Sequence, residues 1–97
     1  MATPAKAQSV PARSIVMVSG RVISFVVRLM WDDGRDEHNV IRYDTAHGVP
    51  HRDTLGIRLG LLRKDWFPDL RLDAVLQQAI EDCKLNHENY IAKFKEN

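Results

Sequence analysis

The sequence predicts an α+β fold, in which a small antiparallel β-sheet of three to five strands carries one long C-terminal helix on one face. Residues 14–31 are rich in β-branched side chains, whereas residues 70–94 repeat apolar side chains every three or four positions. A chain of 97 residues, 44% of them hydrophobic, has the size and composition of one globular domain. We therefore expect a single α+β domain over residues 14–97.

The N-terminal residues differ in composition from this domain. Residues 1–13, MATPAKAQSVPAR, are mostly small or polar and show no apolar pattern, so we expect a flexible tail. The eighteen residues that follow, SIVMVSGRVISFVVRLMW, are too long for one ordinary strand of about five or six residues. The Ser19-Gly20 pair therefore marks either a tight hairpin turn or a bulge within one long strand.

The DDGR segment, residues 32–35, predicts the turn into the next strand. A two-residue turn would place Arg42 and Asp44 on the apolar face of the sheet, where burial of charged groups is costly. A three-residue loop over residues 33–35 moves these side chains to the opposite face, because a shift of one residue reverses every side chain. We therefore predict the three-residue loop.

This loop length determines the expected cross-strand pairs. On the apolar face, Phe25 should lie opposite Tyr43, and Val27 should lie opposite Ile41. The other face should carry a half-polar set, namely Ser24, Val26, Arg28, His38, Val40, Arg42 and Asp44.

The C-terminal half predicts further strands and the helix. Residues 53–67 contain two glycines and predict one or two short strands. Residues 70–94 predict one helix, whose start Asp69 or Asp73 can cap. The apolar stripe of this helix should cover the sheet face that carries Phe25. The stripe consists of Val75, Leu76, Ala79, Ile80 and Cys83.

Composition excludes several classes of protein. The net charge of +1 argues against a protein that wraps duplex DNA, which usually needs a strong basic excess. Cys83 is the only cysteine, so the chain can form neither an internal disulfide nor a cysteine-based zinc site. The longest apolar run, residues 22–31, is too short and too polar to span a bilayer, and the N-terminus does not resemble a signal peptide. We expect a cytoplasmic protein without a membrane partner.

The stretch RYDTAHGVPHRD, residues 42–53, concentrates the residues that carry chemistry. A metal site would need His47 and His51 to converge with a neighbouring aspartate. The two histidines cannot share a helix face, because a glycine and a proline lie between them, and the HExxH pattern is absent. We therefore predict no metal and no cofactor.

Two other interpretations of this stretch remain open. In the first, His47 and His51 transfer protons, Arg42 or Arg52 holds a phosphate, and Asp44 orients a neighbour, as metal-independent RNA cleavage requires. In the second, the stretch is a structural turn in which arginine and aspartate form cross-strand ion pairs.

The stretch resembles a motif of small bacterial proteins that carry RYD-[TN]-A-H-G at the end of a strand, followed by HRD or HRH. Many of them end in a helix similar to AIEDCKLNHENY, residues 79–90 here. By these two stretches the chain, over roughly residues 24–92, is similar to the TumE-like toxins of type II toxin–antitoxin systems. The resemblance implies that the signature positions of the family are Arg42, Asp44, His47, His51 and Arg52.

The motif and the resemblance together lead to one expected function and one alternative. The expected function is that of a toxin-like, metal-independent endoribonuclease, with RNA as substrate and a cognate antitoxin as protein partner. The alternative is a non-enzymatic protein-interaction module, in which the sheet face or the helix docks another protein or forms a homodimer.

Overall fold

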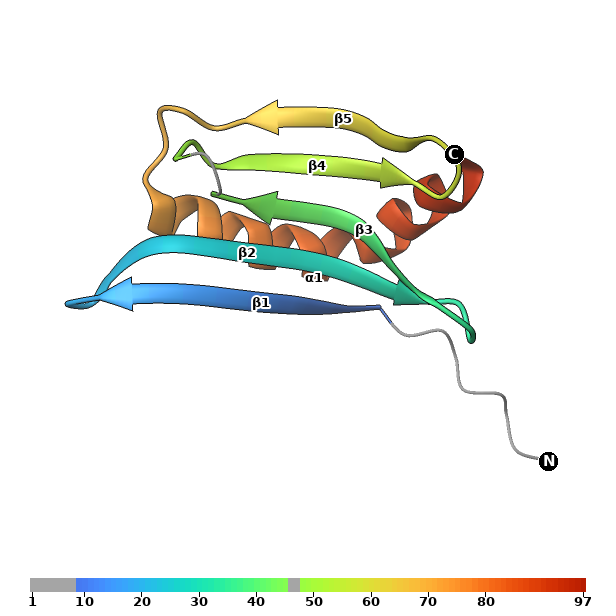
Figure 1. Ribbon diagram of the computed structural model, residues 1–97, viewed down its shortest axis with the longest axis horizontal. Coiled ribbons are helices and arrows are strands. Elements are labelled where there is room, and N and C mark those ends of the chain that lie inside the picture. Colours follow the sequence, from blue (N-terminus) through green and yellow to red (C-terminus); the bar gives the residue numbers. More distant parts are fainter. Residues whose placement is uncertain (1–8, 46–47) are drawn as a thin grey trace.

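The computed structural model describes residues 9–45 and 48–97, with side chains from residue 13 onward, and these residues form one sheet and one long helix (Figure 1). The elements are β1 (Ser9–Val18), β2 (Arg21–Asp32), β3 (Glu37–Asp44), β4 (His51–Gly56), β5 (Gly60–Trp66) and α1 (Leu72–Glu96). The five strands pair antiparallel in the order β1-β2-β3-β4-β5. The helix lies along one face of the sheet, so the predicted α+β fold is confirmed (Figure 1).

The first strand begins earlier than the sequence predicts. Residues 9–13 pair with residues 27–31 of β2, so the prediction of a flexible tail is wrong for residues 9–13. The reason is the length of β2, whose twelve residues offer backbone donors and acceptors along the whole outer edge. Pairing with this edge requires no apolar pattern. Residues 1–8 of the predicted tail lie outside the described residues.

The Ser19-Gly20 pair forms the turn between β1 and β2. Both residues have positive φ angles, 51° and 75°. Positive φ at both central positions is what a two-residue hairpin of the favoured handedness requires. The hairpin alternative is therefore correct.

The pairing of β2 with β3 differs from the predicted register by two residues. Val27 lies opposite Tyr43 and Leu29 opposite Ile41, so the predicted pairs of Phe25 with Tyr43 and of Val27 with Ile41 are wrong. A shift of two residues keeps each side chain on its face. The predicted apolar face is therefore correct even though the pairs are not.

The shift of two residues has two causes. The loop between β2 and β3 contains four residues, 33–36, and the Asp33 carboxylate accepts two backbone N–H groups of this loop at 2.8 Å each. A bulge follows at Val40, where the register shifts by one further residue. The loop alone would have reversed the faces of β3, and the bulge restores them. Because of the bulge, the consecutive residues Val40 and Ile41 are both fully buried.

Residues 37–39 of β3 precede the bulge and keep the pairing that the four-residue loop sets. This pairing places the side chain of His38 on the face that the helix covers. His38 lies opposite Trp31, and its ring centre is 5.6 Å from that of Trp31 and 5.5 Å from that of Phe94 in α1. The sequence predicts His38 and Val40 on the opposite face, and both predictions are wrong.

The helix covers the predicted face. It begins and ends two residues later than expected, and Arg71 occupies its N-cap position without a side-chain hydrogen bond, so the predicted cap by Asp69 or Asp73 is wrong. Asp73 instead lies in the first turn, where its negative charge interacts favourably with the positive end of the helix dipole. The buried core joins two strands, β2 and β3, to the helix. It consists of Phe25, Val27, Leu29, Val40, Ile41, Tyr43, Val75, Ala79, Cys83 and Phe94.

We call the other side of the sheet the open face, because no helix of the described chain covers it (Figure 1). The register and the side-chain contacts place seven polar or aromatic residues of β2 to β5 on it. They are Arg28, Arg42, Asp44, His51, Asp53, Lys64 and Trp66. Within residues 9–45 and 48–97, the helix lacks the apolar length that crossing a membrane requires.

Candidate functional site

The predicted site stretch spans the end of β3, the following loop and the start of β4. Because β3 and β4 are neighbours, its residues pair across the two strands: Asp44 lies opposite His51, and Tyr43 opposite Arg52. Alternation along each strand then separates the stretch into two groups on opposite faces. The structure therefore brings Arg42, Asp44 and His51 together on the open face and places Arg52 on the helix face. The predicted residue His47 lies outside the described residues.

On the open face, Arg42 and Asp44 form a close ion pair. The Arg42 Nε atom is 2.9 Å from Asp44 Oδ2. The Asp44 side chain is 6% exposed, whereas that of Arg42 is 44% exposed. Arg42 Nε is itself buried without a well-aligned hydrogen bond, so the contact depends on charge rather than on hydrogen-bond geometry. The buried carboxylate of Asp44 therefore holds a guanidinium that remains accessible to solvent.

His51 is buried, at 3% exposure, so its ring does not face solvent. Its ring centre is 5.0 Å from that of Trp66 in β5, and its Nε2 atom is 3.7 Å from Asp53 Oδ2. A histidine beside proline suggests a turn, whereas His51 is the first residue of a strand that β5 flanks. Proton transfer by His51 would therefore require the substrate to reach a buried ring.

A row of charged residues crosses the open face along one line of cross-strand partners. Arg28 lies directly opposite Arg42, Arg42 opposite Asp53, and Asp53 opposite Lys64. Lys64 Nζ is 3.5 Å from Asp53 Oδ1 and 5.3 Å from the centre of the Trp66 ring. Arg28 is exposed, and among the described residues it has no ion-pair partner. Like charges directly opposite one another destabilise a sheet, so the Arg28–Arg42 pair needs an explanation.

A shallow hollow of about 280 Å³ adjoins this row on the open face. It is bordered on one side by the Arg42–Asp44 pair and on the other by Ser14 and Val16 of β1. The backbone of Thr45 closes its end, because the Thr45 N–H donates to the Phe25 carbonyl at 3.3 Å. The hollow is therefore next to a guanidinium and large enough for a small anionic group.

On the helix face, Arg52 lies at the centre of a polar network between sheet and helix. Its guanidinium donates to Asp65 of β5 at 2.9 Å and to Asp82 of α1 at 3.3 Å. It also donates to the hydroxyls of Tyr90, at 3.1 Å, and of Tyr43, at 3.4 Å. Both tyrosine hydroxyls donate in turn to Asp82, at 2.6 Å from Tyr43 and 2.7 Å from Tyr90. We call these five residues the Arg52 network.

The network shifts the ionisation of its members. Burial opposes the charge on Asp82, but hydrogen bonds from Tyr43, Tyr90 and Asn86 outweigh this effect and hold the pKa of Asp82 below its usual value. Burial and the neighbouring carboxylate both raise the pKa values of Tyr43 and Tyr90. Every charge of the network has a partner, which is typical of a structural role rather than of a free reactive group. The structure thus places Arg52 on the opposite face of the sheet from His51 and does not bring these two predicted site residues together.

The sequence does not indicate the network directly, because partners that form hydrogen bonds in it are up to 39 positions apart. One sign was available. Asp82 interrupts the apolar stripe of the helix directly before Cys83, and an acidic residue at that position requires a buried partner.

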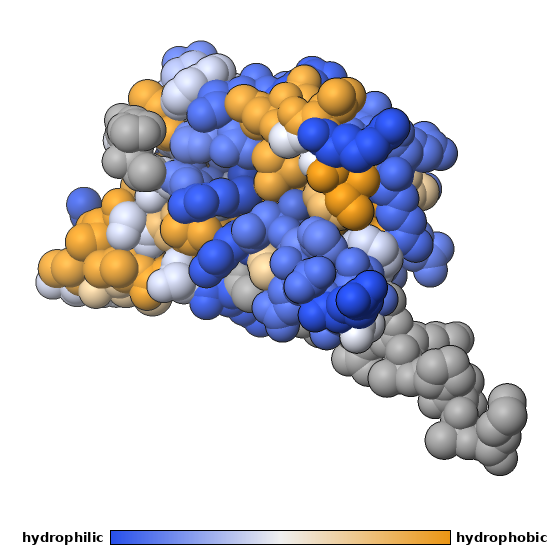
Figure 2. Space-filling view, turned by 45° about the vertical axis from the view of Figure 1, so that its right-hand side comes forward, coloured by the Kyte–Doolittle hydropathy of each residue, from blue (hydrophilic) through white to orange (hydrophobic). Residues whose placement is uncertain are grey.

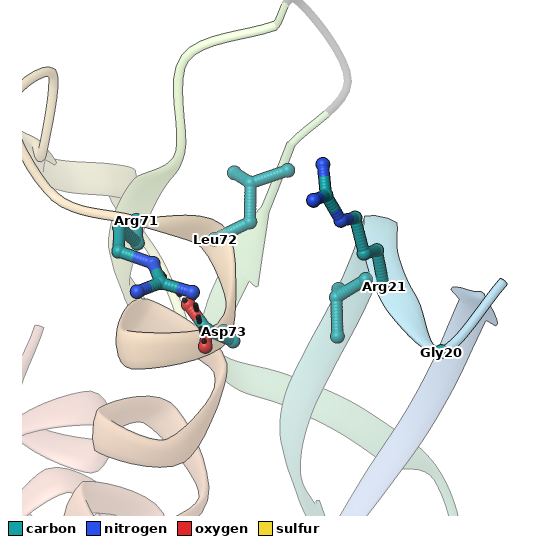
Figure 3. Close-up of a pocket in the computed structure, with 6 residues that line it drawn as sticks. Gly20, Arg21, Arg71, Leu72 and Asp73 are labelled. Atoms are coloured by element: carbon teal, nitrogen blue, oxygen red, sulfur yellow. Dashed lines mark hydrogen bonds and ion pairs between the residues drawn. The ribbon is translucent and has the colours of Figure 1, made fainter. Parts of the chain in front are cut away.

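A second hollow, of about 450 Å³, lies between the β1–β2 turn and the start of α1. Figure 3 shows Arg21 and Arg71 on opposite sides of Leu72, with Arg71 directed toward Asp73. The Arg71–Asp73 ion pair, 3.3 Å long, neutralises one of the two cations. None of the predicted site residues lines this hollow. Nor do any three histidine, cysteine or acidic side chains gather as metal ligands in the part of the chain that the structure describes.

Comparison with known proteins gives one match. No curated protein and no solved structure is significantly similar to the chain. A family model described as a domain of unknown function, DUF7718, matches residues 11–97, almost the whole of the described domain, and the chain therefore belongs to this family.

Proposed function

We propose that the open face binds single-stranded RNA through its phosphate groups. The observation that carries this proposal is the direct cross-strand pairing of Arg28 with Arg42. Like charges on directly opposite residues repel one another, and an anion bound by both side chains would remove the repulsion. Arginine suits this role because its planar fork holds phosphate oxygens in pairs.

The rest of the open face supports a single strand rather than a duplex. Trp66, at the β5 end of the face, is 50% exposed and can stack on an unpaired base. Lys64 lies beside its ring and supplies a further cation. The net charge of only +1 is too small for extended duplex binding but is compatible with a short basic path on one face.

The resemblance to TumE-like toxins adds a second step to this proposal. Bound RNA would be cleaved in the cytoplasm, and a cognate antitoxin would block the open face. Asp44 and His51 lie opposite one another beside Arg42 and are the nearest groups for proton transfer. RNA binding by the arginine pair does not depend on this second step.

A binding experiment with labelled single-stranded RNA of about 12 nucleotides tests the proposal. Arg28→Gln should weaken binding about tenfold, because one charge-assisted phosphate contact is worth about 1.4 kcal/mol. It should also reduce the slope of log affinity against log salt by about 0.7. Arg35→Gln is the matched control, because Arg35 is an exposed arginine in the β2–β3 loop and away from the open face.

Equal binding by the Arg28→Gln and Arg35→Gln proteins would refute the proposal. Gel analysis of the same RNA after incubation tests cleavage separately. Cleavage by the wild-type protein that His51→Gln abolishes, while binding persists, would support the second step. Intact RNA would restrict the function to binding.

A further inference from the structure

The free end of the β1–β2 hairpin carries a contiguous apolar surface. The side chains of Val16, Met17, Val18 and Ile23 are between 49% and 56% exposed, and that of Ile15 is 37% exposed. Figure 2 shows apolar residues gathered at this end of the molecule, at the lower left of the view. Single exposed apolar residues are ordinary, but a contiguous patch of them marks an interaction site.

This surface belongs to an unprotected sheet edge. Outer strands usually carry charged residues or proline, which prevent pairing with another strand. The outer strand β5 follows this rule, because RKD occupies its middle at residues 63–65. In β1, Pro11 and Arg13 occur only in the first half, and residues 14–18, SIVMV, contain neither charge nor proline. The second half of β1 is therefore open to pairing.

We propose that residues 14–18 of β1 pair antiparallel with the same residues of a second copy of the chain, about a two-fold axis through Val16. Val16 then lies opposite the partner's Val16, and Ile15 lies opposite the partner's Met17. The result is a continuous sheet that extends across both copies.

The segment favours a second copy because it complements itself. With the two-fold axis at Val16, every residue of the uncharged segment lies opposite another residue of the same segment in the partner. Each apolar side chain therefore contacts an uncharged side chain on the same face of the sheet. An axis at Arg13 would instead place two arginines opposite one another, which is unfavourable. Residues 14–18 are uncharged and carry apolar side chains on both faces of the strand, so they fit a partner strand with the same properties.

The backbone agrees with this axis. The register of β1 with β2 shifts between Val16 and Met17, but the extra residue, Ile23, lies in β2, so β1 keeps its own alternation. Val18 next to the two-residue turn directs its N–H and C=O groups toward β2, and so does the alternate residue Val16. Ile15 and Met17 therefore direct their backbone groups outward, where they can bond to the partner's Met17 and Ile15. The Val16 residues of the two copies then form a non-hydrogen-bonded pair with Cα atoms about 4.5 Å apart.

The axis is perpendicular to the sheet, so both helices lie on one side and both open faces on the other. The Arg28–Arg42 pairs of the two copies thus share one surface. The dimer does not depend on RNA binding, and its failure would leave the proposed function intact.

Disulfide cross-linking in the full chain tests the axis directly. Val16→Cys should form a covalent dimer under mild oxidation, because a Cα separation of about 4.5 Å suits a disulfide. Ser14→Cys alone should not, since the two Ser14 residues would be about 13 Å apart along the strands. A mixture of the Ser14→Cys and Val18→Cys proteins should cross-link, because these positions lie opposite one another. The natural Cys83 will not compete, because it is fully buried and burial raises its pKa to about 12.

Sedimentation of the unmodified protein between about 1 µM and 1 mM tests the association itself. An interface made by one pair of five-residue strand segments is small, and a small interface dissociates in that range. Met17→Lys should abolish the dimer, whereas Leu59→Lys, which changes an apolar residue that is 68% exposed near β5, should not. A monomer at all concentrations would overturn the proposal. So would a dimer that Met17→Lys leaves intact, or one that cross-links through Ser14→Cys rather than Val16→Cys.

Discussion

The Arg52 network makes Asp82 the position where one substitution should cost the most stability. Asp82→Ala removes the acceptor of both tyrosine hydroxyls and one of the two carboxylates that bind Arg52. The Asp82 side chain is only 12% exposed, so water cannot fully replace these bonds. Three polar groups would then lie between sheet and helix with fewer partners.

The magnitude follows from these contacts. Breaking a buried charge pair by removing one partner costs about 3 to 5 kcal/mol. Arg52 keeps Asp65 at 2.9 Å, so the lower end of this range applies, about 3 kcal/mol. For a domain of this length, each kcal/mol lowers Tm by about 4 to 8 °C, which predicts a loss of roughly 12 to 24 °C.

Urea and thermal unfolding followed by circular dichroism measure this loss. Asp73→Ala is the matched control, because Asp73 lies in the same helix and pairs with an arginine, but its side chain is 57% exposed. This change should cost about 0.5 kcal/mol. Losses of equal size in the two proteins would refute the structural role of the network.

Acid should reproduce part of the effect. The folded protein holds the pKa of Asp82 below its usual value of about 4, so the contribution of Asp82 is complete above that value and is lost as pH falls through the folded pKa. Asp82→Ala should therefore show a flatter acid limb than the wild-type protein. If both proteins lose stability equally between neutral pH and about pH 3, the carboxylate is not the group responsible.

Two further predictions concern β1 and the tyrosines. Deleting residues 1–13 should lower Tm by about 4 to 8 °C more than deleting residues 1–8, because the longer deletion also removes the backbone pairs of residues 9–13 with β2. Equal melting temperatures would contradict this pairing. The raised pKa values of Tyr43 and Tyr90 should make stability complete below about pH 10 and cause it to fall as pH rises further, since unfolding then releases protons. Urea titrations across that range should show the fall, and Tyr90→Phe should reduce it; a flat profile would contradict the burial of the hydroxyls.

The fold class and the face that the helix covers could be predicted from periodicity alone. The alternation of Phe25, Val27 and Leu29 and the helical stripe around Ala79 each define one apolar face, and two apolar faces pack together. The register could not be predicted, because it depends on two local features. The carboxylate of Asp33 lengthens the loop by one residue, and the bulge at Val40 adds another.

The site was predicted only in part for a different physical reason. Residues 42–53 form one cluster in the sequence, but the alternation of a strand divides neighbouring residues between two environments. Arg42 and Asp44 meet as expected. The burial of His51 depends on Trp66, and Arg52 pairs with Asp65 and Asp82, so each requires a contact that only the completed fold creates.

The Arg52 network also explains why two separate stretches should vary together among related chains. Arg52 belongs to RYDTAHGVPHRD, and Asp82, Asn86 and Tyr90 belong to AIEDCKLNHENY. The side chains of the two stretches meet at the Asp82 carboxylate, so a change on one side leaves an unpaired group on the other. Selection should therefore preserve or replace the two stretches jointly. Arg28 and Arg42 on the open face should instead vary with the ligand that this face binds, independently of the helix. Covariation in an alignment should link Arg52 to the helix and leave the open-face arginines as an independent group.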